Sequence, residues 1–429
     1  MGRAMFIEFR LRNYRSFREA QTLSMVAAAP FKEHARANTF DPKVKGFDAL
    51  LHSAVVYGPN AAGKTNLLRA IQFMQSMVLN SASTTTGAQY IYSPFKFSTA
   101  TRTEPTEFQV TFVQNGTRYE YGFEMGPRRI EKEWLIQHVH TRGRTMFERN
   151  FDSKREQYKW SFSPFLKGQR SVWSESTRPD ALFLSTAIQL NSQQLAPVFE
   201  WFQRRLVVIV GATSMNPTLT LQVLDRPDGK ERLLPFFREA DLGIADLDIK
   251  REPVASGALI LAPGANLGAI IEQAPGVAIP NLVRITFSHW SDDPEQPVGL
   301  DFTEESSGTQ ILFRTAGAWL NVWANGEVLL FDEIDTSLHP LLTRFLIDKF
   351  HSVSTNPNNA QLIFSTHDTS LLSQDIFRRD QIWFVDKERD GATRLYPLTD
   401  FKPRNDEKLE SWYMRGRYGA LPLLPNVES

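Results

Sequence analysis

Gly58-Pro59-Asn60-Ala61-Ala62-Gly63-Lys64-Thr65 is the stretch of this 429-residue chain that decides its fold. It matches the pattern Gly-x-x-x-x-Gly-Lys-Thr, which is the P-loop. The glycines let the backbone curl, so that successive N–H groups point at phosphate oxygens. Lys64 adds a positive charge for the β- and γ-phosphates, and Thr65 offers a hydroxyl to Mg²⁺. We therefore expect Gly58 to Thr65, with the following Asn66, to bind a nucleoside triphosphate.

The residues on either side of this loop support the same prediction. Ala54–Tyr57 is a short apolar, β-branched run that indicates a buried strand. After the loop, Leu67, Ile71, Met74 and Val78 recur at helical spacing. Strand, loop and helix in this order bring the positive end of a helix against the bound phosphates.

An acidic pair, Asp332-Glu333, closes the apolar run Val328–Phe331 some 270 residues later in the chain. A continuous apolar run is typical of a parallel strand covered on both faces. At the end of such a strand we expect Asp332 to hold Mg²⁺ and Glu333 to activate the attacking water. A helix N-terminal acidic pair is the alternative, and the two interpretations are compatible.

A third apolar strand, Gln361–Ser365, is followed by Thr366-His367-Asp368. Ligands of open α/β sheets bind at the carboxyl ends of the strands. We therefore expect His367 to be a catalytic residue that hydrogen-bonds the γ-phosphate or the attacking water. A purely structural histidine is the alternative.

These three strands, in this order, resemble the ABC-type ATPases, a superfamily that includes SMC and RecF-like proteins. That superfamily carries a signature, Leu-Ser-Gly-Gly-Gln, shortly before the Asp-Glu strand. Here Ser307, Gly308 and Gln310 match it, whereas Ser306 replaces the Leu and Thr309 replaces the second Gly. In the family the signature binds the γ-phosphate of ATP held by the other subunit. The resemblance therefore implies that Ser307, Gly308 and Gln310 act in trans.

Three further segments narrow the resemblance. Asn13–Phe17 is similar to the N-terminal segment of this group, Asp335–Pro340 to its D-loop, and Arg415–Ala420 to the ending of one subgroup. That subgroup is the stand-alone RloA-like ATPases of prokaryotes, which are related to OLD ATPases and linked to anti-phage defence.

The expected fold class is α/β, an ABC-type ATPase head with a P-loop parallel core sheet and an antiparallel β-lobe. Phe108–Val113 and Tyr119–Phe123 flank the turn Asn115-Gly116, which is a strong hairpin signal within that lobe. We expect an N-terminal ATPase lobe over residues 1–170, an inserted mixed α-helical subdomain over 171–300, and a C-terminal ATPase lobe over 301–429. The insert contains a strand candidate at Leu206–Val210 and a Pro/Gly/Ala-rich loop or partner surface at 253–280. No sustained heptads occur, so no long coiled coil is expected.

The composition excludes several classes of function. Lys+Arg and Asp+Glu are equal at 48 each, so no global charge steers the chain to nucleic acid or membrane. There is no cysteine, which excludes disulfides and thiol catalysis. No apolar run reaches membrane-spanning length, and a cytoplasmic protein is expected. Locally, residues 128–170 hold eleven Lys/Arg against five Asp/Glu among aromatics, which indicates either a nucleic-acid contact or the solvated face of a β-lobe.

Three functions remain open from the sequence. The first is an ATP-gated homodimer or higher oligomer, a sensor or switch that controls a separately encoded effector of Toprim or nuclease type in anti-phage defence. The second is a RecF- or SMC-like DNA-repair ATPase that clamps DNA directly. The third is a scaffold that uses ATP only for assembly. ATP and Mg²⁺ are the expected substrate and cofactor.

Overall fold

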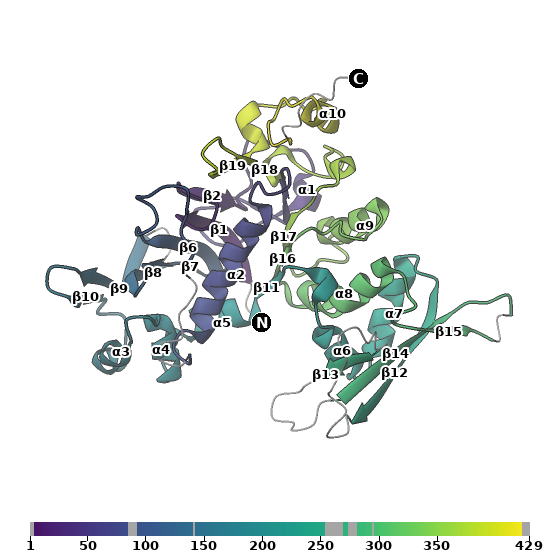
Figure 1. Ribbon diagram of the computed structural model, residues 1–429, viewed down its shortest axis with the longest axis horizontal. Coiled ribbons are helices and arrows are strands. Elements are labelled where there is room, and N and C mark those ends of the chain that lie inside the picture. The colour runs from purple at the N-terminus through teal and green to yellow at the C-terminus, as the bar shows by residue number, and fades with distance from the viewer. Residues whose placement is uncertain are drawn as a thin grey trace. The chain divides into compact units, whose positions relative to one another are not determined.

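The core of the larger part of the molecule is a six-stranded sheet (Figure 1). The computed structural model describes residues 4–84, 92–139, 142–253, 269–272, 281–293 and 296–422. The first five strands in the spatial order run parallel, and the sixth is antiparallel to the fifth. In spatial order they are β11 (Leu206–Ile209), β16 (Val328–Phe331), β17 (Gln361–Ser365), β5 (Ser53–Tyr57), β18 (Ile382–Lys387) and β19 (Thr393–Pro397).

The three strands predicted to bear the site are direct neighbours in this sheet. Every residue of β5, β16 and β17 is buried, as expected for parallel strands covered on both faces. Because β16, β17 and β5 run in the same direction, their carboxyl ends meet at one edge. This arrangement confirms the predicted P-loop core.

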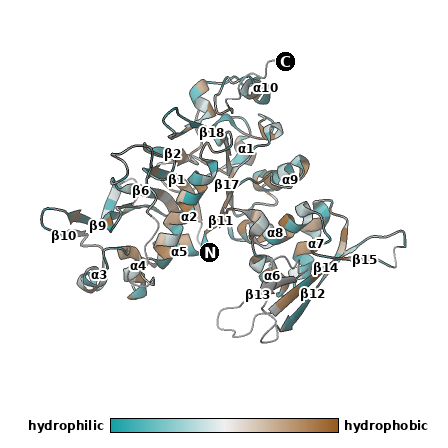
Figure 2. Cartoon of the chain, in the orientation of Figure 1, coloured by the Kyte–Doolittle hydropathy of each residue, from teal (hydrophilic) through white to brown (hydrophobic). Residues whose placement is uncertain are grey.

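Helix α2 (Lys64–Asn80) begins directly after the P-loop and is amphipathic. Its apolar residues, including Leu67, Ile71, Met74 and Val78, are buried in one core cluster with residues of both large sheets. Its outer face bears Arg69, Gln72, Ser76 and Asn80. Figure 2 shows this alternation as brown and teal segments along the helix.

The predicted antiparallel β-lobe is a seven-stranded sheet. Its order is β10 (Gln157–Phe162), β9 (Arg142–Asp152), β8 (Ile130–Val139), β7 (Thr117–Met125), β6 (Thr106–Gln114), β1 (Ala4–Arg12) and β2 (Gln21–Ser24). The predicted hairpin joins β6 to β7, and both turn residues have positive φ, 52° at Asn115 and 75° at Gly116. Positive φ at both positions is the type I′ turn that matches the twist of the strands.

Three helices follow this lobe in the chain, α3 (Arg170–Ser176), α4 (Phe183–Gln189) and α5 (Ala196–Arg204), and a buried ion pair attaches the start of α4 to it. The side chains of Glu133 and Arg149 are fully buried and lie 3.1 Å apart. Glu133 also accepts hydrogen bonds from the Phe183 and Leu184 amides at 2.7 and 3.0 Å, at the start of α4. Arg149 is thus one of the basic residues in 128–170 that is structural rather than available to a ligand.

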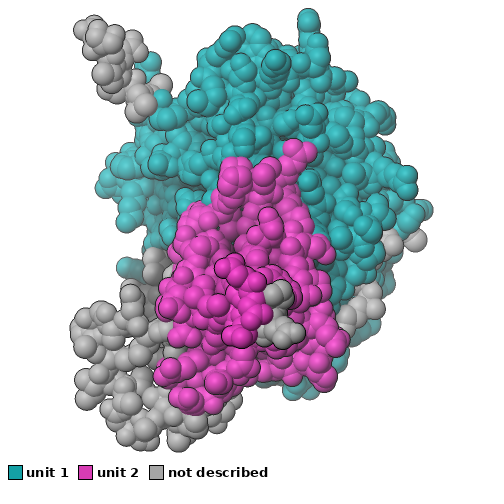
Figure 3. All heavy atoms as spheres, turned by 90° about the vertical axis from the view of Figure 1, so that its right-hand side faces the viewer, with its two compact units in different colours: residues 1–210, 322–335, 346–429 teal, residues 211–321, 336–345 magenta. Residues whose placement is uncertain are grey.

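The chain forms two compact units, drawn in different colours in Figure 3. Unit 1 comprises residues 1–210, 322–335 and 346–429 and holds both large sheets. Unit 2 comprises residues 211–321 and 336–345. Its four-stranded sheet has β14 (Asn281–His289) between β12 (Ile244–Pro253) and β13 (Ala269–Glu272), and β15 (Val298–Asp301) also pairs with β14. Unit 2 also holds α6 (Thr218–Leu224) and α7 (Gly229–Glu239).

These boundaries differ from the three consecutive segments expected from the sequence. Leu206–Ile209 was expected in the insert, but its parallel pairing with β16 makes it the edge strand of the ATPase core. The insert is mixed, as predicted, because α6 and α7 accompany its four-stranded sheet. Within the predicted loop at 253–280, residues 269–272 form β13, and residues 254–268 and 273–280 lie outside the described part.

Two helices run from one unit into the other, α8 (Ser307–Asn325) and α9 (Pro340–His351). The longest described helix, α8, has 19 residues. Among the described residues, no helix combines the length and apolar character that crossing a membrane requires. The small elements are α1 (Ala35–Asn38), β3 (Thr39–Phe40), β4 (Leu50–Leu51) and α10 (Leu409–Met414).

Candidate active site

The P-loop connects β5 to α2, and its shape depends on Gly63. This residue has φ of 122°, in the region that favours glycine. A Cβ at the same position would lie 2.4 Å from the Thr393 Oγ1. Thr393 in turn donates a hydrogen bond to the Ala62 carbonyl at 2.6 Å. The P-loop therefore packs directly against Thr393 of β19, and a side chain at position 63 would force the two apart.

Lys64 is a buried cation at the first position of α2, with 4% of its surface exposed. Its Nζ donates to the Gly58 carbonyl at 2.7 Å and to the Pro59 carbonyl at 3.3 Å. Burial lowers the Lys64 pKa to about 8, although the nearby carboxylates of Glu333, Asp332 and Asp335 act to raise it. Burial disfavours the positively charged form of Lys64, and an anion bound in the loop would stabilise it. A phosphate group is such an anion.

Asp332 follows β16 and is held by the end of the neighbouring strand. The Ser365 Oγ donates to Asp332 Oδ1 at 2.6 Å and accepts a hydrogen bond from the Glu333 amide at 2.8 Å. Asp332 is 6% exposed, and its own amide donates to the Ile209 carbonyl of β11 at 2.9 Å. One hydroxyl thus fixes both members of the acidic pair, and it does so from the strand that leads to His367.

Glu333 and His367 face each other across the edge of the sheet. Glu333 has φ of 51° and a half-exposed side chain, so its carboxylate turns away from the buried strand. Its Oε1 lies 3.9 Å from the His367 Nε2. The His367 amide donates to the Asp335 carboxylate at 3.3 and 3.4 Å. Burial and then the Lys64 charge lower the His367 pKa, which favours the neutral imidazole at neutral pH.

The structure brings most of the predicted site residues together in unit 1. Gly58–Asn66, Asp332, Glu333 and His367 all lie at the carboxyl ends of β5, β16 and β17. The Asn66 side chain, however, donates to Ser16 Oγ at 2.9 Å, which ties the N-terminal segment to α2. The predicted signature residues Ser307, Gly308 and Gln310 lie at the start of α8 in unit 2.

Sequence reasoning missed the roles of Ser365 and Thr393. Ser365 was recognised only as the last residue of an apolar strand, and a polar residue at that point was the available signal. Thr393 has no local motif, because its contact with the Ala62 carbonyl arises from the pairing of β18 with β19. Both residues hold the site rather than contact the expected ligand.

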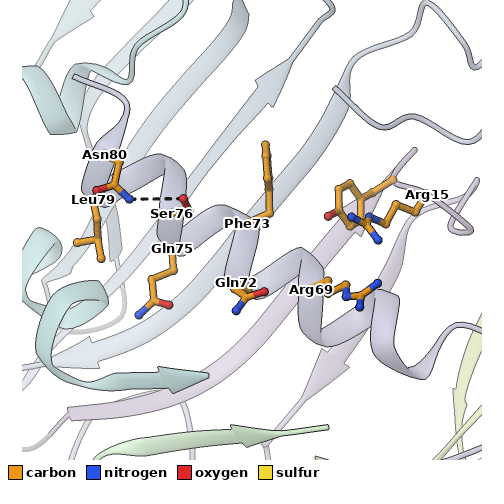
Figure 4. A pocket seen from close by; sticks show the side chains of 9 residues that line it. Arg15, Arg69, Gln72, Phe73, Gln75, Ser76, Leu79 and Asn80 are labelled. Atoms are coloured by element: carbon orange, nitrogen blue, oxygen red, sulfur yellow. Dashed lines mark hydrogen bonds between the residues drawn. The ribbon is translucent and has the colours of Figure 1, made fainter. Parts of the chain in front are cut away.

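A hollow of about 510 Å³ runs along the outer face of α2 (Figure 4). Arg15 and Arg69 lie at one end of it, and Gln72, Ser76 and Asn80 follow along the helix. None of the residues that line it carries a carboxylate. The hollow is therefore cationic and rich in hydrogen-bond donors.

The donor set at the main site fits Mg²⁺ and a polyphosphate. The candidate Mg²⁺ residues, Thr65 and Asp332, offer a hydroxyl and a carboxylate, which are the hard oxygen donors that Mg²⁺ prefers. Among the described residues, no group of three or more His, Cys, Asp and Glu side chains could hold a metal alone. Mg²⁺ commonly binds through one or two protein ligands together with substrate phosphates, so this donor set is adequate.

The P-loop at the carboxyl end of β5 and the acidic pair two strands away define a P-loop ATPase. The family follows from a sequence comparison: the AAA_21 family model, described as "AAA domain, putative AbiEii toxin, Type IV TA system", matches residues 53–373. These are 321 of the 429 residues, and the chain belongs to this family. The match includes the P-loop, the acidic pair and His367.

Comparison with solved structures finds similarity to the SMC head domain from Thermotoga maritima. The sequence identity is 13% and the TM-score 0.37, over 91% of this chain and 98% of that chain. Similarity at this level supports no conclusion about function. A comparison with curated proteins gives no match.

Proposed function

We propose that this protein hydrolyses ATP and that its ATP-closed homodimer, or a higher oligomer of it, switches a separately encoded effector in the cytoplasm. The observation that supports hydrolysis is the group formed by Asp332, Ser365 and Glu333 beside the buried Lys64. A site for nucleotide binding alone needs the P-loop, but it does not need an oriented acidic pair with a neutral imidazole beside it.

Each residue of this group has a distinct proposed task. Glu333, half-exposed and 3.9 Å from His367, accepts a proton from the attacking water. His367 donates a hydrogen bond to the γ-phosphate, and Lys64 stabilises the charge on the β- and γ-phosphates. Thr65 and Asp332 hold Mg²⁺, which when bound neutralises the phosphate charge. Ser365 keeps Asp332 and the Glu333 backbone in register.

The proposed dimer follows from where the signature residues lie. Ser307 is exposed at the start of the 19-residue helix α8, where its hydroxyl and the positive end of the helix can meet an anion. In the dimer, Ser307, Gly308 and Gln310 of one protomer complete the ATP site of its partner. ATP binding would then close the dimer and hydrolysis would open it.

The proposal of a separate effector rests on two resemblances. The sequence resembles RloA-like ATPases of anti-phage defence, and the matching family is described with a type IV toxin–antitoxin system. We propose that the closed dimer holds or releases an effector of nuclease or Toprim type. Affinity purification from the native host tests this, with the ATP-bound and the ATP-free variants below as paired baits.

The Glu333→Gln variant tests the hydrolytic site. It should bind ATP, turn it over at least about a hundredfold more slowly, and accumulate as a dimer in light scattering. Lys64→Ala is the matched control, because it should neither bind ATP nor dimerise. Wild-type turnover by Glu333→Gln would remove Glu333 from the mechanism. A wild-type protein that dimerises with ATP without hydrolysing it would instead be the scaffold.

The cationic hollow on α2 favours one alternative function, a DNA-clamping ATPase. Arg69 is exposed there and is near Arg15 without a carboxylate in the lining. Arg69→Glu should then weaken binding to duplex DNA and reduce its salt dependence. The charge-matched variant Lys154→Glu, on the exposed turn between β9 and β10, separates this hollow from the basic stretch 128–170.

A further inference from the structure

Hydrogen bonds among its own residues shape the signature segment in unit 2. The Ser306 Oγ accepts a hydrogen bond from the Thr309 amide at 3.1 Å, which caps the start of α8. The Gln310 Nε2 donates to the Glu305 carbonyl at 2.9 Å. These local bonds define the shape of the segment, but they do not fix it to the rest of the unit.

Glu305 provides that attachment. Its side chain is 5% exposed, and its Oε1 lies 2.5 Å from the Nε2 of His289, which is 23% exposed. His289 is the last residue of β14, and its backbone is paired with Ile244 of β12 on one side and Val298 of β15 on the other. The contact therefore joins the residue just before Ser306 to a strand that is fixed on both sides.

A second contact supports the segment from another direction. A Cβ at Gly308 would lie 2.9 Å from the Ser337 carbonyl, so the backbone of the signature approaches the segment that follows Asp335 closely. Ser337 itself has φ of 61°. The exposed residues Ser306 and Ser307 thus lie between two contacts. On one side Glu305 pairs with His289, and on the other Gly308 packs against the Ser337 carbonyl.

The burial of Glu305 shows that this pair differs from an ordinary surface ion pair. In the same unit, Lys230 and Asp246 lie 2.8 Å apart, but their side chains are 46% and 53% exposed. Such a pair contributes little and holds nothing in place. A carboxylate as buried as Glu305 strongly requires a partner, so loss of His289 would force the segment to move until Glu305 reaches water.

We propose that His289 and Glu305 are positioning residues for the signature, and that they set where Ser307 and Gly308 meet the partner's nucleotide. This inference rests on the proposed function, because it assumes that the signature acts across a dimer. It assigns a task to the four-stranded sheet of unit 2, whose central strand ends at His289. A misplacement of about 1 Å in such a site lowers turnover by up to about a hundredfold.

The experiment compares three variants of the full-length protein: His289→Ala, His289→Gln and the control Asp246→Asn. His289→Ala should reduce ATP turnover by about ten- to a hundredfold. The affinity of the protomer's own P-loop for fluorescent ADP should change by less than about twofold. His289→Gln, which keeps a neutral donor, should recover most of the turnover. Asp246→Asn should behave as wild type.

A second readout separates positioning from a general loss of folding. In the Glu333→Gln background, His289→Ala should raise the ATP concentration needed for half-maximal dimerisation, and hydrogen exchange should increase at residues 303–312. Equal turnover in His289→Ala and Asp246→Asn would overturn the positioning role. Absence of ATP-dependent dimerisation in the Glu333→Gln parent would instead overturn the proposed function, so the two failures are distinguishable.

Discussion

Acidification should destabilise this protein through a buried histidine at the amino end of β5. His351, at the end of α9, is 9% exposed, and its Nε2 lies 2.8 Å from the Oγ of Ser53, the first residue of β5. The Gln381 Nε2 is 3.5 Å away, and the Phe377 ring packs edge-on against the imidazole. Two titratable neighbours, His52 and His34, carry positive charge when protonated, so they further disfavour a proton on His351.

The size of the effect follows from the two pKa values. Burial, followed by the His52 and His34 charges, lowers the His351 pKa to about 3, whereas an unfolded histidine has a pKa of about 6.5. Between these values the unfolded chain binds a proton that the folded chain does not. Stability is therefore lost as pH falls below about 6.5, and the loss from His351 alone reaches about 2 kcal/mol at pH 5.

Urea unfolding at pH 7 and pH 5, followed by tryptophan fluorescence, measures this loss. The free energy of unfolding of wild type should fall by about 2 kcal/mol more than that of His351→Gln between the two pH values. His339→Gln, which removes an exposed histidine, should follow wild type. If His351→Gln and wild type lose the same stability on acidification, the buried neutral histidine is not the cause.

Two further outcomes concern the site itself. Ser365→Ala removes the hydrogen bonds to Asp332 and from the Glu333 amide. Turnover should therefore fall roughly tenfold or more, while fluorescent ADP binds nearly as in wild type. Turnover equal to that of wild type would show that Ser365 is not needed. Because the Lys64 pKa is about 8, the ammonium form that attracts phosphate becomes scarce above that pH. ATP affinity measured by calorimetry should fall about tenfold from pH 7 to pH 9, and a flat profile would contradict the lowered pKa.

The sequence predicted the core of this molecule because its signals are local. The P-loop, the apolar strand before it and the helical spacing after it specify β5 and α2 without reference to the rest of the chain. The same holds for β16 with Asp332-Glu333, for β17 with His367, and for the Asn115-Gly116 hairpin. Each of these elements is marked by residues next to one another, and each was found.

The features that were missed depend on contacts between distant residues. Leu206–Ile209 has an ordinary apolar sequence, and only its pairing with β16 places it in the ATPase core rather than in the insert. Ser365 gains its importance from Asp332, which precedes it by 33 residues, and Thr393 from Ala62, 331 residues away. Arg149 was counted with a basic stretch because its burial beside Glu133 has no signature in the local sequence.

Mixing two inactive variants tests the shared ATP site most directly. Lys64→Ala disables the P-loop of its own protomer, and Ser307→Arg blocks only the site it would present to the partner. With random pairing in an equal mixture, half of the dimers would join one variant to the other. In each of these the P-loop of Ser307→Arg meets the signature of Lys64→Ala, so one site of two is intact. ATPase activity should then recover to at most about one quarter of the wild-type rate. No recovery above the two separate variants would contradict a signature that acts in trans.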